Sequence, residues 1–296
     1  MGKITKVYIA GCGVGLRLHE PIIKEIGTTY EFVRLPDNHD ETKNTIVNYM
    51  DGLLIIGTPI YKQKEHLLYG LNHYSTILCE KPCCLSALEI DDVIKLQQRT
   101  NAQVFVNYQL RFLNTIPIIK GIITEEDVSF INIKYVSSVR KQLEVPSWYK
   151  DKKKGGGVKN SIFSHLIDLL KYLGVGFLIA KEINQFSLDK IDISFESLSG
   201  LLIRINIDTV NEYDMFLMEI GKKNKTLLFD LVSDQEVDKT SFCKYLCGAL
   251  SSRVEGPWRK GFRRLLSEIL EGNYNHCKLA RLEDALFVHE VLDTIE

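Results

Sequence analysis

The chain has 296 residues, enough for one large domain or two medium ones, each able to bury a hydrophobic core. Apolar residues make up 45% of the chain and charged residues 25%, as in ordinary soluble globular proteins. The formal net charge of -1 excludes an overall field that would attract nucleic acid or anionic lipid. We therefore expect neither nucleic acid nor a membrane as a partner.

The cysteines favour a reducing compartment. There are seven, an odd number in a chain too long to need a disulfide framework. Cys243 and Cys247 are separated by three residues, but no second pair and no suitably spaced histidine completes a zinc site. No apolar stretch is long enough to span a bilayer, and the N-terminus lacks the features of a signal peptide. These features predict a cytoplasmic protein without a metal site.

The first third of the chain alternates short apolar runs with amphipathic stretches. Strands are expected at 6–11, 30–35, 51–59, 76–82 and 103–109, and helices at 18–27, 41–50, 62–74 and 86–100. Strands that alternate with helices in this way predict right-handed βαβ units and a parallel sheet. The pattern predicts an α/β fold with an N-terminal doubly wound domain over residues 1–115.

The pattern changes after residue 115. A long alternating strand is expected at 128–138 and a helix at 161–174, and strands follow at 181–188, 190–197, 200–210, 213–221 and 225–233. Consecutive strands without intervening helices predict a largely antiparallel open sheet. Two helices, at 258–272 and 281–295, close the chain. We expect a second α/β domain over 116–296, with the C-terminal helix either inside it or packed back on the first domain.

Residues 150–157, KDKKKGGG, form the one strongly biased stretch. Three consecutive glycines disfavour both helix and strand, so the stretch is predicted to be a loop. Its lysines are consistent either with a solvated loop or with binding of a phosphorylated ligand.

Residues 7–21, VYIAGCGVGLRLHEP, approach the dinucleotide-binding pattern Gly-x-Gly-x-x-Gly between a strand and a helix. Gly11 suits the tight turn, and Gly13 would let the backbone approach a pyrophosphate at the helix N-terminus. The third glycine is expected at position 16, where the chain has Leu16. The candidate phosphate-binding loop is Gly11, Cys12, Gly13, Val14 and Gly15. The alternative is a glycine-rich turn that binds no nucleotide.

The residues after the second strand leave the choice of cofactor open. Asp37 is a candidate for the ribose 2′-hydroxyl of NAD, and Arg34 for the 2′-phosphate of NADP. Neither residue lies at the expected end of the strand, so the sequence predicts NAD or NADP.

A Glu80-Lys81-Pro82 sequence ends the fourth strand, at the sheet edge where ligands bind in open α/β sheets. Lys81 is suited to donate a proton or hydrogen bond to a substrate oxygen, and Glu80 to hold it in place. The alternative is a surface ion pair before a helix.

Several motifs together resemble the glucose–fructose oxidoreductase/inositol dehydrogenase (Gfo/Idh/MocA) family. They are AGCGVGLRLHEP, DGLLIIGTP, ILCEKP, VNYQLRF, GGGVKNSIFSHLIDLLKYLG, MEIGKKNKTLLFD and KLARLEDALFVHEVLDTI, in the family's order. The resemblance implies a Rossmann domain that binds NAD(P), with Glu80 and Lys81 beside the cofactor. It also implies a second domain whose open sheet forms homodimers or homotetramers. Its substrates would be sugars, cyclitols or nucleotide-linked sugars, as in surface-polysaccharide biosynthesis.

The chain has the residue typical of the family at some positions and a different residue at others. Matching residues are Gly11, Gly13, His19, Thr58, Pro59, Lys81, Asn107, Arg111 and His165. The resemblance implies that Thr58 and Pro59 lie beside the nicotinamide, that Asn107 and Arg111 line the substrate pocket, and that Lys81 and His165 are catalytic. Ile60 and Gln63 stand where the family usually has Asn and His.

Ser161 stands where the family usually has an aspartate four residues before the histidine. A serine still binds a sugar hydroxyl, but it carries no charge and takes no proton near neutral pH. Either Lys81 and His165 suffice, or the chemistry has been lost or changed. Asp168, one turn past His165, is interpreted as a structural residue.

The sequence therefore favours an NAD(P)-dependent oxidoreductase in which Lys81 and His165 handle the proton. Two alternatives stay open. One is a non-catalytic nucleotide-binding regulator or structural oligomer partner. The other is a lyase or hydrolase that retains its NAD.

Overall fold

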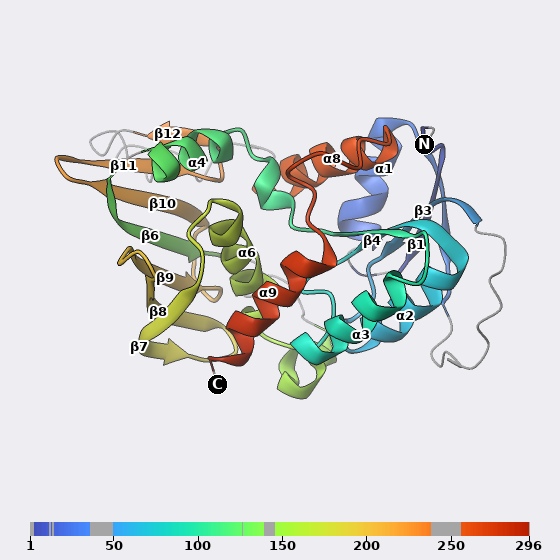
Figure 1. Cartoon of the computed structure of the whole chain (residues 1–296), viewed down its shortest axis with the longest axis horizontal. Helices are drawn as coiled ribbons and strands as arrows, with labels where there is room; N and C mark the ends of the chain where they lie inside the picture. Colours follow the sequence, from blue (N-terminus) through green and yellow to red (C-terminus); the bar gives the residue numbers. More distant parts are fainter. Residues whose placement is uncertain are drawn as a thin grey trace. The chain divides into compact units, whose positions relative to one another are not determined.

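The computed structural model of the chain describes residues 3–11, 13, 15–35, 50–125, 127–138, 146–237 and 256–295. The chain forms two compact units (Figure 1). The first consists of residues 1–109 and 262–294, and the second of residues 110–261 and 295. In the described part of the chain, no helix is both long and apolar enough to cross a membrane.

A parallel five-stranded sheet forms the centre of the first unit. Its strands are β1 (Lys6–Ala10), β2 (Thr29–Val33), β3 (Met50–Ile56), β4 (Tyr74–Cys79) and β5 (Gln103–Val106), in the order β2-β1-β3-β4-β5. All four pairings are parallel. The central strands are almost fully buried, because a parallel sheet carries helices on both faces. The predicted doubly wound Rossmann sheet is confirmed.

Helices connect these strands. They are the π-helical turn η1 (Gly15–His19), α1 (Glu20–Ile26), α2 (Ile60–His73) and α3 (Ala87–Gln97). α1 ends at Gly27, whose φ of 78° is the left-handed conformation that glycine adopts without strain. The helix expected at 41–50 lies outside the described residues, except for Met50, which begins β3.

The first unit is completed by the end of the chain. α8 (Pro257–Leu270) contributes its residues from 262 onward, and α9 (Leu282–Asp293) packs against α3. Backbone hydrogen bonds tie this segment to the sheet, from Ile4 N to Leu270 O (2.8 Å) and from Val106 N to Ala280 O (3.0 Å).

A seven-stranded mixed sheet forms the second unit. Its strands are β6 (Val128–Val136), β7 (Leu178–Phe186), β8 (Lys190–Ser197), β9 (Leu202–Asp208), β10 (Met215–Lys222), β11 (Lys225–Asp230) and β12 (Gln235–Val237). The order is β12-β11-β10-β6-β9-β8-β7, and only β6 and β9 pair in parallel. Buried and less buried residues alternate along β8 and β9, because one face of the sheet is packed. The predicted, largely antiparallel second sheet is confirmed.

The second unit also contains elements that the sequence pattern did not indicate. β12 is one, and α4 (Thr115–Glu125) is the other. The carboxylate of Asp234 begins α4 by accepting hydrogen bonds from the backbone N of Asn114 (2.8 Å) and from the N and Oγ1 of Thr115 (both 2.9 Å). The remaining helical segments are η2 (Gln109–Phe112), η3 (Ser147–Lys150), η4 (Lys152–Lys154), η5 (Lys159–Phe163) and α6 (Ser164–Tyr172).

The stretch predicted as a loop over 150–157 contains short 3₁₀ turns, η3 and η4, before its glycines. Gly155 (φ 76°) and Gly157 (φ 97°) adopt positive φ. A Cβ at Gly156 would lie 2.0 Å from the carbonyl oxygen of Tyr149. Each glycine is therefore required by backbone geometry.

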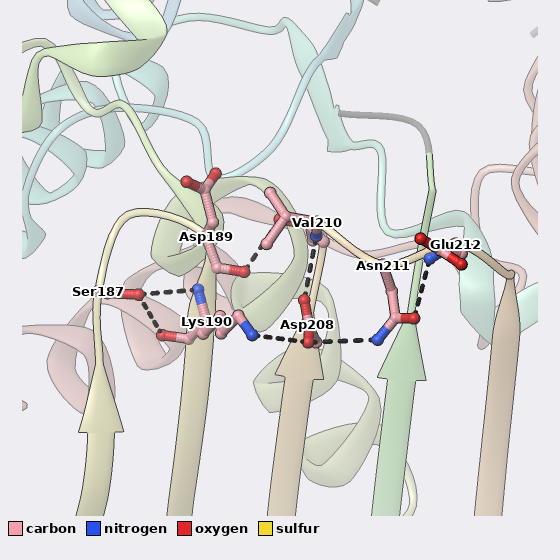
Figure 2. A network of polar contacts seen from close by, with 8 residues as sticks. Ser187, Asp189, Lys190, Asp208, Val210, Asn211 and Glu212 are labelled. Atoms are coloured by element: carbon pink, nitrogen blue, oxygen red, sulfur yellow. Dashed lines mark hydrogen bonds and ion pairs between the residues drawn. The ribbon is translucent and has the colours of Figure 1, made fainter. Parts of the chain in front are cut away.

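A polar network joins the turn between β7 and β8 to the end of β9, and Figure 2 shows it at the tips of neighbouring strands. Three hydrogen bonds between Ser187 and the backbone of Lys190 close the turn, and Lys190 Nζ lies 2.9 Å from Asp208 Oδ2. Leu188 in the same turn accepts a hydrogen bond from Val158 N (2.8 Å), so the network also supports the glycine segment.

Candidate functional site

The carboxyl ends of the parallel strands position the candidate residues of the first unit. Hydrogen bonds continue from strand to strand beyond the strands themselves, from Gly57 N to Ala10 O (2.7 Å), Glu80 N to Ile56 O (2.9 Å) and Asn107 N to Cys79 O (2.9 Å). Residues that follow β1, β3, β4 and β5 therefore share one edge of the sheet. This is the edge at which open α/β sheets bind ligands.

Two glycines of the candidate phosphate-binding loop have opposite surroundings. Gly11 has a φ of 109°, and a Cβ there would lie 2.3 Å from the carbonyl oxygen of Gly57. Gly13 is exposed, and a Cβ there would meet no atom within 4 Å. Gly15 begins η1, while Cys12 and Val14 lie outside the described residues. Gly11 thus permits strand packing, and Gly13 leaves open space beside the backbone for a phosphate group.

These surroundings predict different effects of two alanine substitutions. Gly11→Ala is expected to destabilise the first unit by about 1–3 kcal/mol, because its Cβ collides with backbone. Gly13→Ala is expected to leave the melting temperature unchanged and to weaken NADH binding about tenfold or more, because the methyl group occupies the space beside the loop. Thermal denaturation and NADH fluorescence titration of both variants test this. Equal losses of stability in the two variants would contradict it.

The residues expected to choose between NAD and NADP are only partly described. Arg34 is exposed just after β2, and Asp37 lies outside the described residues.

Thr58 and Pro59, after β3, are held by α2. Thr58 O accepts a hydrogen bond from Gln63 Nε2 (3.1 Å), and Thr58 Oγ1 lies 2.8 Å from His66 Nδ1. Pro59 precedes the first residue of α2. Gln63, which departs from the family pattern, therefore fixes the Thr58–Pro59 turn.

Glu80 lies at the centre of a buried polar cluster. Its Oε1 accepts hydrogen bonds from His19 Nε2 and from Asn107 Nδ2, both at 2.7 Å. Phe262 stacks on the His19 ring, with centroids 4.6 Å apart. Burial raises the pKa of Glu80, but His19, Lys81 and Asn107 together outweigh it and hold the pKa below its ordinary value. Glu80 is therefore a carboxylate at neutral pH, and its Oε2 accepts no hydrogen bond from any described residue.

Glu80→Gln is expected to destabilise the protein by about 1–3 kcal/mol at neutral pH, because an amide replaces a buried charged acceptor. The folded pKa lies below the unfolded value, so the carboxylate contributes fully above about pH 4.5, and its contribution is lost as pH falls through the folded pKa. Urea unfolding at pH 7 and in acid checks this, with the exposed Glu31→Gln as control. A difference in the free energy of unfolding between wild type and Glu80→Gln that does not change with pH would refute this prediction.

Lys81 and Pro82 are joined by a cis peptide bond. Pro82 O lies 3.2 Å from Nε2 of the buried His289 in α9. Cys79, Cys83 and Cys84 around this turn are buried and form no disulfide bond. Burial raises the pKa of the Cys79 thiol, so it is a thiol and not a nucleophile at neutral pH.

In the second unit, η5 and α6 carry Ser161 and His165. Ser161 is half-buried, and its Oγ lies 3.2 Å from the phenol oxygen of Tyr149. His165 is buried, and its ring centroid lies 4.7 Å from that of Trp258. Phe216 in turn stacks on Trp258, with ring centroids 6.1 Å apart. The candidate proton-transfer residue therefore lies against an aromatic side chain, Trp258.

Arg111, expected to line the substrate pocket, binds Asp168. Its Nε donates to Asp168 Oδ2 at 2.9 Å, a second bond joins Nη2 to Oδ1, and both residues are buried. This bidentate pair supports the interpretation of Asp168 as structural.

Sequence reasoning missed His66, Tyr149 and Trp258. His66 follows Thr58 by two helical turns, but Tyr149 and Trp258 reach Ser161 and His165 only through tertiary packing. One usable signal for Tyr149 was its place six residues before the first glycine of the triple glycine.

Comparisons with known proteins agree with this geometry. Residues 6–108 match the family model GFO_IDH_MocA, described as an oxidoreductase family with an NAD-binding Rossmann fold. Glucose-6-phosphate 3-dehydrogenase of Bacillus subtilis is 25% identical over 191 residues, which cover 57% of this chain and 54% of that relative. The chain thus matches about half the length of this curated relative.

Solved structures share the fold over nearly the whole chain. The WlbA dehydrogenase from Bordetella pertussis, in complex with NADH and UDP-GlcNAcA, has a TM-score of 0.76 at 15% identity, covering 99% of this chain and 94% of that one. A super-repressor mutant of Gal80p from Saccharomyces cerevisiae has a TM-score of 0.72 at 13% identity, covering 99% of this chain and 95% of that one. Over residues 6–108 the chain thus matches the model of the NAD-binding Rossmann domain of the Gfo/Idh/MocA oxidoreductase family, which confirms the resemblance of its sequence motifs.

Proposed function

We propose that the protein is an NAD(P)-dependent oxidoreductase that acts on a sugar, cyclitol or nucleotide-linked sugar. The observation that carries the proposal is the Glu80 cluster, which places a buried carboxylate next to Lys81 at the ligand-binding edge of the sheet. Burying a carboxylate costs free energy unless hydrogen-bond donors surround it. A turn with a purely structural role would not require such a charged group.

The described residues fit the cofactor. Gly13 offers open backbone for the pyrophosphate, and Glu80 Oε2 is an acceptor for a ribose hydroxyl. Thr58 and Pro59, fixed by α2, form a rigid wall for the nicotinamide. When bound, NAD(P) supplies or accepts the hydride.

The chain's own residues handle the proton and the substrate. Lys81 donates to the oxygen of the reacting hydroxyl or carbonyl, and His165 exchanges the hydroxyl proton. Asn107 and Ser161 bind further hydroxyls. Arg111 acts indirectly, because its guanidinium is committed to Asp168.

Sugar-type substrates are supported by the relatives' names, among them glucose-6-phosphate 3-dehydrogenase. A nucleotide-linked sugar of polysaccharide biosynthesis agrees with the exposed lysines 152–154. A cytoplasmic homodimer or homotetramer is proposed with it. The location rests on the odd number of cysteines in a chain too long to need a disulfide framework.

The fold shared with Gal80p favours one alternative, a non-catalytic nucleotide-binding regulator. Ile60, Gln63 and Ser161, which depart from the family pattern, agree with it. A lyase or hydrolase that retains NAD would keep Lys81 and His165 and return the cofactor to its starting redox state in each turnover.

The first experiment is titration of the purified protein with NADH and with NADPH, followed by nicotinamide fluorescence. Micromolar binding of one cofactor supports the proposal and identifies it as NAD or NADP. Reduction of that cofactor by sugars, absent in Lys81→Ala, then separates an enzyme from a regulator. Failure to bind either cofactor would overturn the proposal.

A further inference from the structure

The segment that directly follows Lys81, residues 82–87, connects the end of β4 to the start of α3. Within it, Cys83 has a φ of 77°. This left-handed conformation is strained for a residue with a Cβ, and it persists only where the surrounding structure holds it. The 82–87 segment therefore depends on contacts from other elements, and any movement of its first residue would pass to Lys81.

The C-terminal helix α9 supplies contacts at both ends of this segment. His289 Nε2 donates a hydrogen bond to Pro82 O at 3.2 Å. Asp293 Oδ2 accepts one from Ala87 N at 3.3 Å, and its carboxylate lies at the positive end of α3, which begins at Ala87. Because His289 and Asp293 are four residues apart, they lie on one face of α9. This face of α9 thus holds the segment at its first and last residues.

The hydrogen bond to Pro82 accounts for a histidine at this buried position. His289 is 1% exposed, and its neighbours on the buried side of α9 are aliphatic, among them Val288 and Leu292. Burying an imidazole costs free energy unless its nitrogen is hydrogen-bonded. A carbonyl oxygen only accepts hydrogen bonds, so Nε2 of His289 carries a proton. Packing alone gives no reason for this polar side chain, whereas Pro82 O does.

The residue before Lys81 is held as firmly as the residue after it. His19 and Asn107 bind the Glu80 carboxylate, and the positive charge of Lys81 helps to keep the pKa of Glu80 below its ordinary value. The charges of Glu80 and Lys81 are therefore close enough to interact. The half-buried Lys81 lies between two residues that other elements of the first unit fix in place.

We propose that His289 is a positioning residue, which through Pro82 O holds Lys81 in the orientation that proton donation requires. Asp293 supports the same segment at its far end. The inference rests on the proposed function, in which Lys81 donates to the reacting oxygen. Misplacing a catalytic group by about 1 Å lowers a rate by about 10²-fold, so a contact to the next residue is enough to affect the chemistry. His289 acts through the backbone of the turn and takes no part in the proton transfer.

The reactivity of the Lys81 amine measures this without cofactor or substrate. Wild type and variants are acetylated briefly with acetic anhydride, and the extent at each lysine is read by mass spectrometry, with the exposed Lys95 as internal reference. His289→Leu removes the donor, and His289→Gln replaces it with an amide that can donate to the same oxygen. Val288→Ala is the matched control, because it removes part of a buried α9 side chain that makes no hydrogen bond.

Relative to Lys95, Lys81 is expected to be acetylated about two- to tenfold faster in His289→Leu than in wild type, because the turn loses a hydrogen bond. His289→Gln is expected to stay within about twofold of wild type. Val288→Ala is expected to lower the melting temperature and leave Lys81 acetylation unchanged. Unchanged acetylation in a folded His289→Leu, the same increase in Val288→Ala, or no rescue by His289→Gln would overturn the inference.

Two controls keep these outcomes separate. Circular dichroism shows whether each variant folds. If His289→Leu does not, the exposed Asp293→Ala decides, since it frees the other end of the segment. Acetylation of Lys81 is then expected to rise about twofold or more, and no rise would overturn the inference.

NADH titration of the same samples separates the two proposals. Absence of NADH binding in wild type counts against the proposed function. NADH binding by wild type, together with unchanged Lys81 acetylation in the folded variants, counts against this inference alone.

Discussion

Replacing Lys81 with alanine is expected to lower the rate of NAD(P)-linked sugar oxidation by about 10²- to 10⁴-fold, the usual contribution of a positioned acid or base. The side chain directly follows Glu80 at the end of β4, and the turn that carries it is supported by His289. Removing its ammonium group takes away the donor to the reacting oxygen but leaves the sheet edge and Glu80 in place.

The measurement is the initial rate of NADH or NADPH formation with glucose 6-phosphate as first substrate, together with cofactor affinity by fluorescence. Lys95→Ala is a matched control, because Lys95 is an exposed lysine on α3 paired with Asp91. It is expected to leave the rate unchanged. If Lys81→Ala retained the wild-type rate, Lys81 would have no role in the chemistry.

Arg111→Met is expected to cost about 3–5 kcal/mol of unfolding free energy, the largest stability effect we expect. The substitution leaves the buried Asp168 carboxylate without its guanidinium, and an uncompensated buried charge is strongly destabilising. The double variant Arg111→Met/Asp168→Leu is expected to recover much of this loss, since both charges are then removed.

Urea denaturation followed by tryptophan fluorescence measures these values. The control is Arg204→Met, which breaks the exposed pair between Arg204 and Asp192 on the sheet and is expected to change stability by about 1 kcal/mol or less. A full additive loss in the double variant would show that Arg111 and Asp168 stabilise the unit independently.

The sheets were largely predictable from local pattern. The strands of the parallel sheet are short apolar runs, because they are buried on both faces, and β8 alternates residue by residue, because it is buried on one. α4 was not indicated, since its apolar residues are mostly β-branched and Pro117 and Gly121 interrupt them. Its start depends on Asp234, a residue distant in sequence, which no local pattern reveals.

The candidate site was predictable where a strand end fixes the residue. Glu80 and Asn107 follow adjacent strands, and their side chains do meet. The sequence did not reveal that Arg111 binds Asp168 or that Tyr149 reaches Ser161, because both depend on how helices and loops pack in three dimensions. Single-sequence reasoning finds chemical groups more readily than their partners.

The first unit is discontinuous in sequence, and this has a consequence for synthesis. Its five strands are complete by residue 106, but α9, which packs on α3, ends at residue 293. At ordinary translation rates the intervening residues take about 10–40 s to make. During that interval the nascent sheet exists without its last helix, so the unit that begins first on the ribosome is completed last.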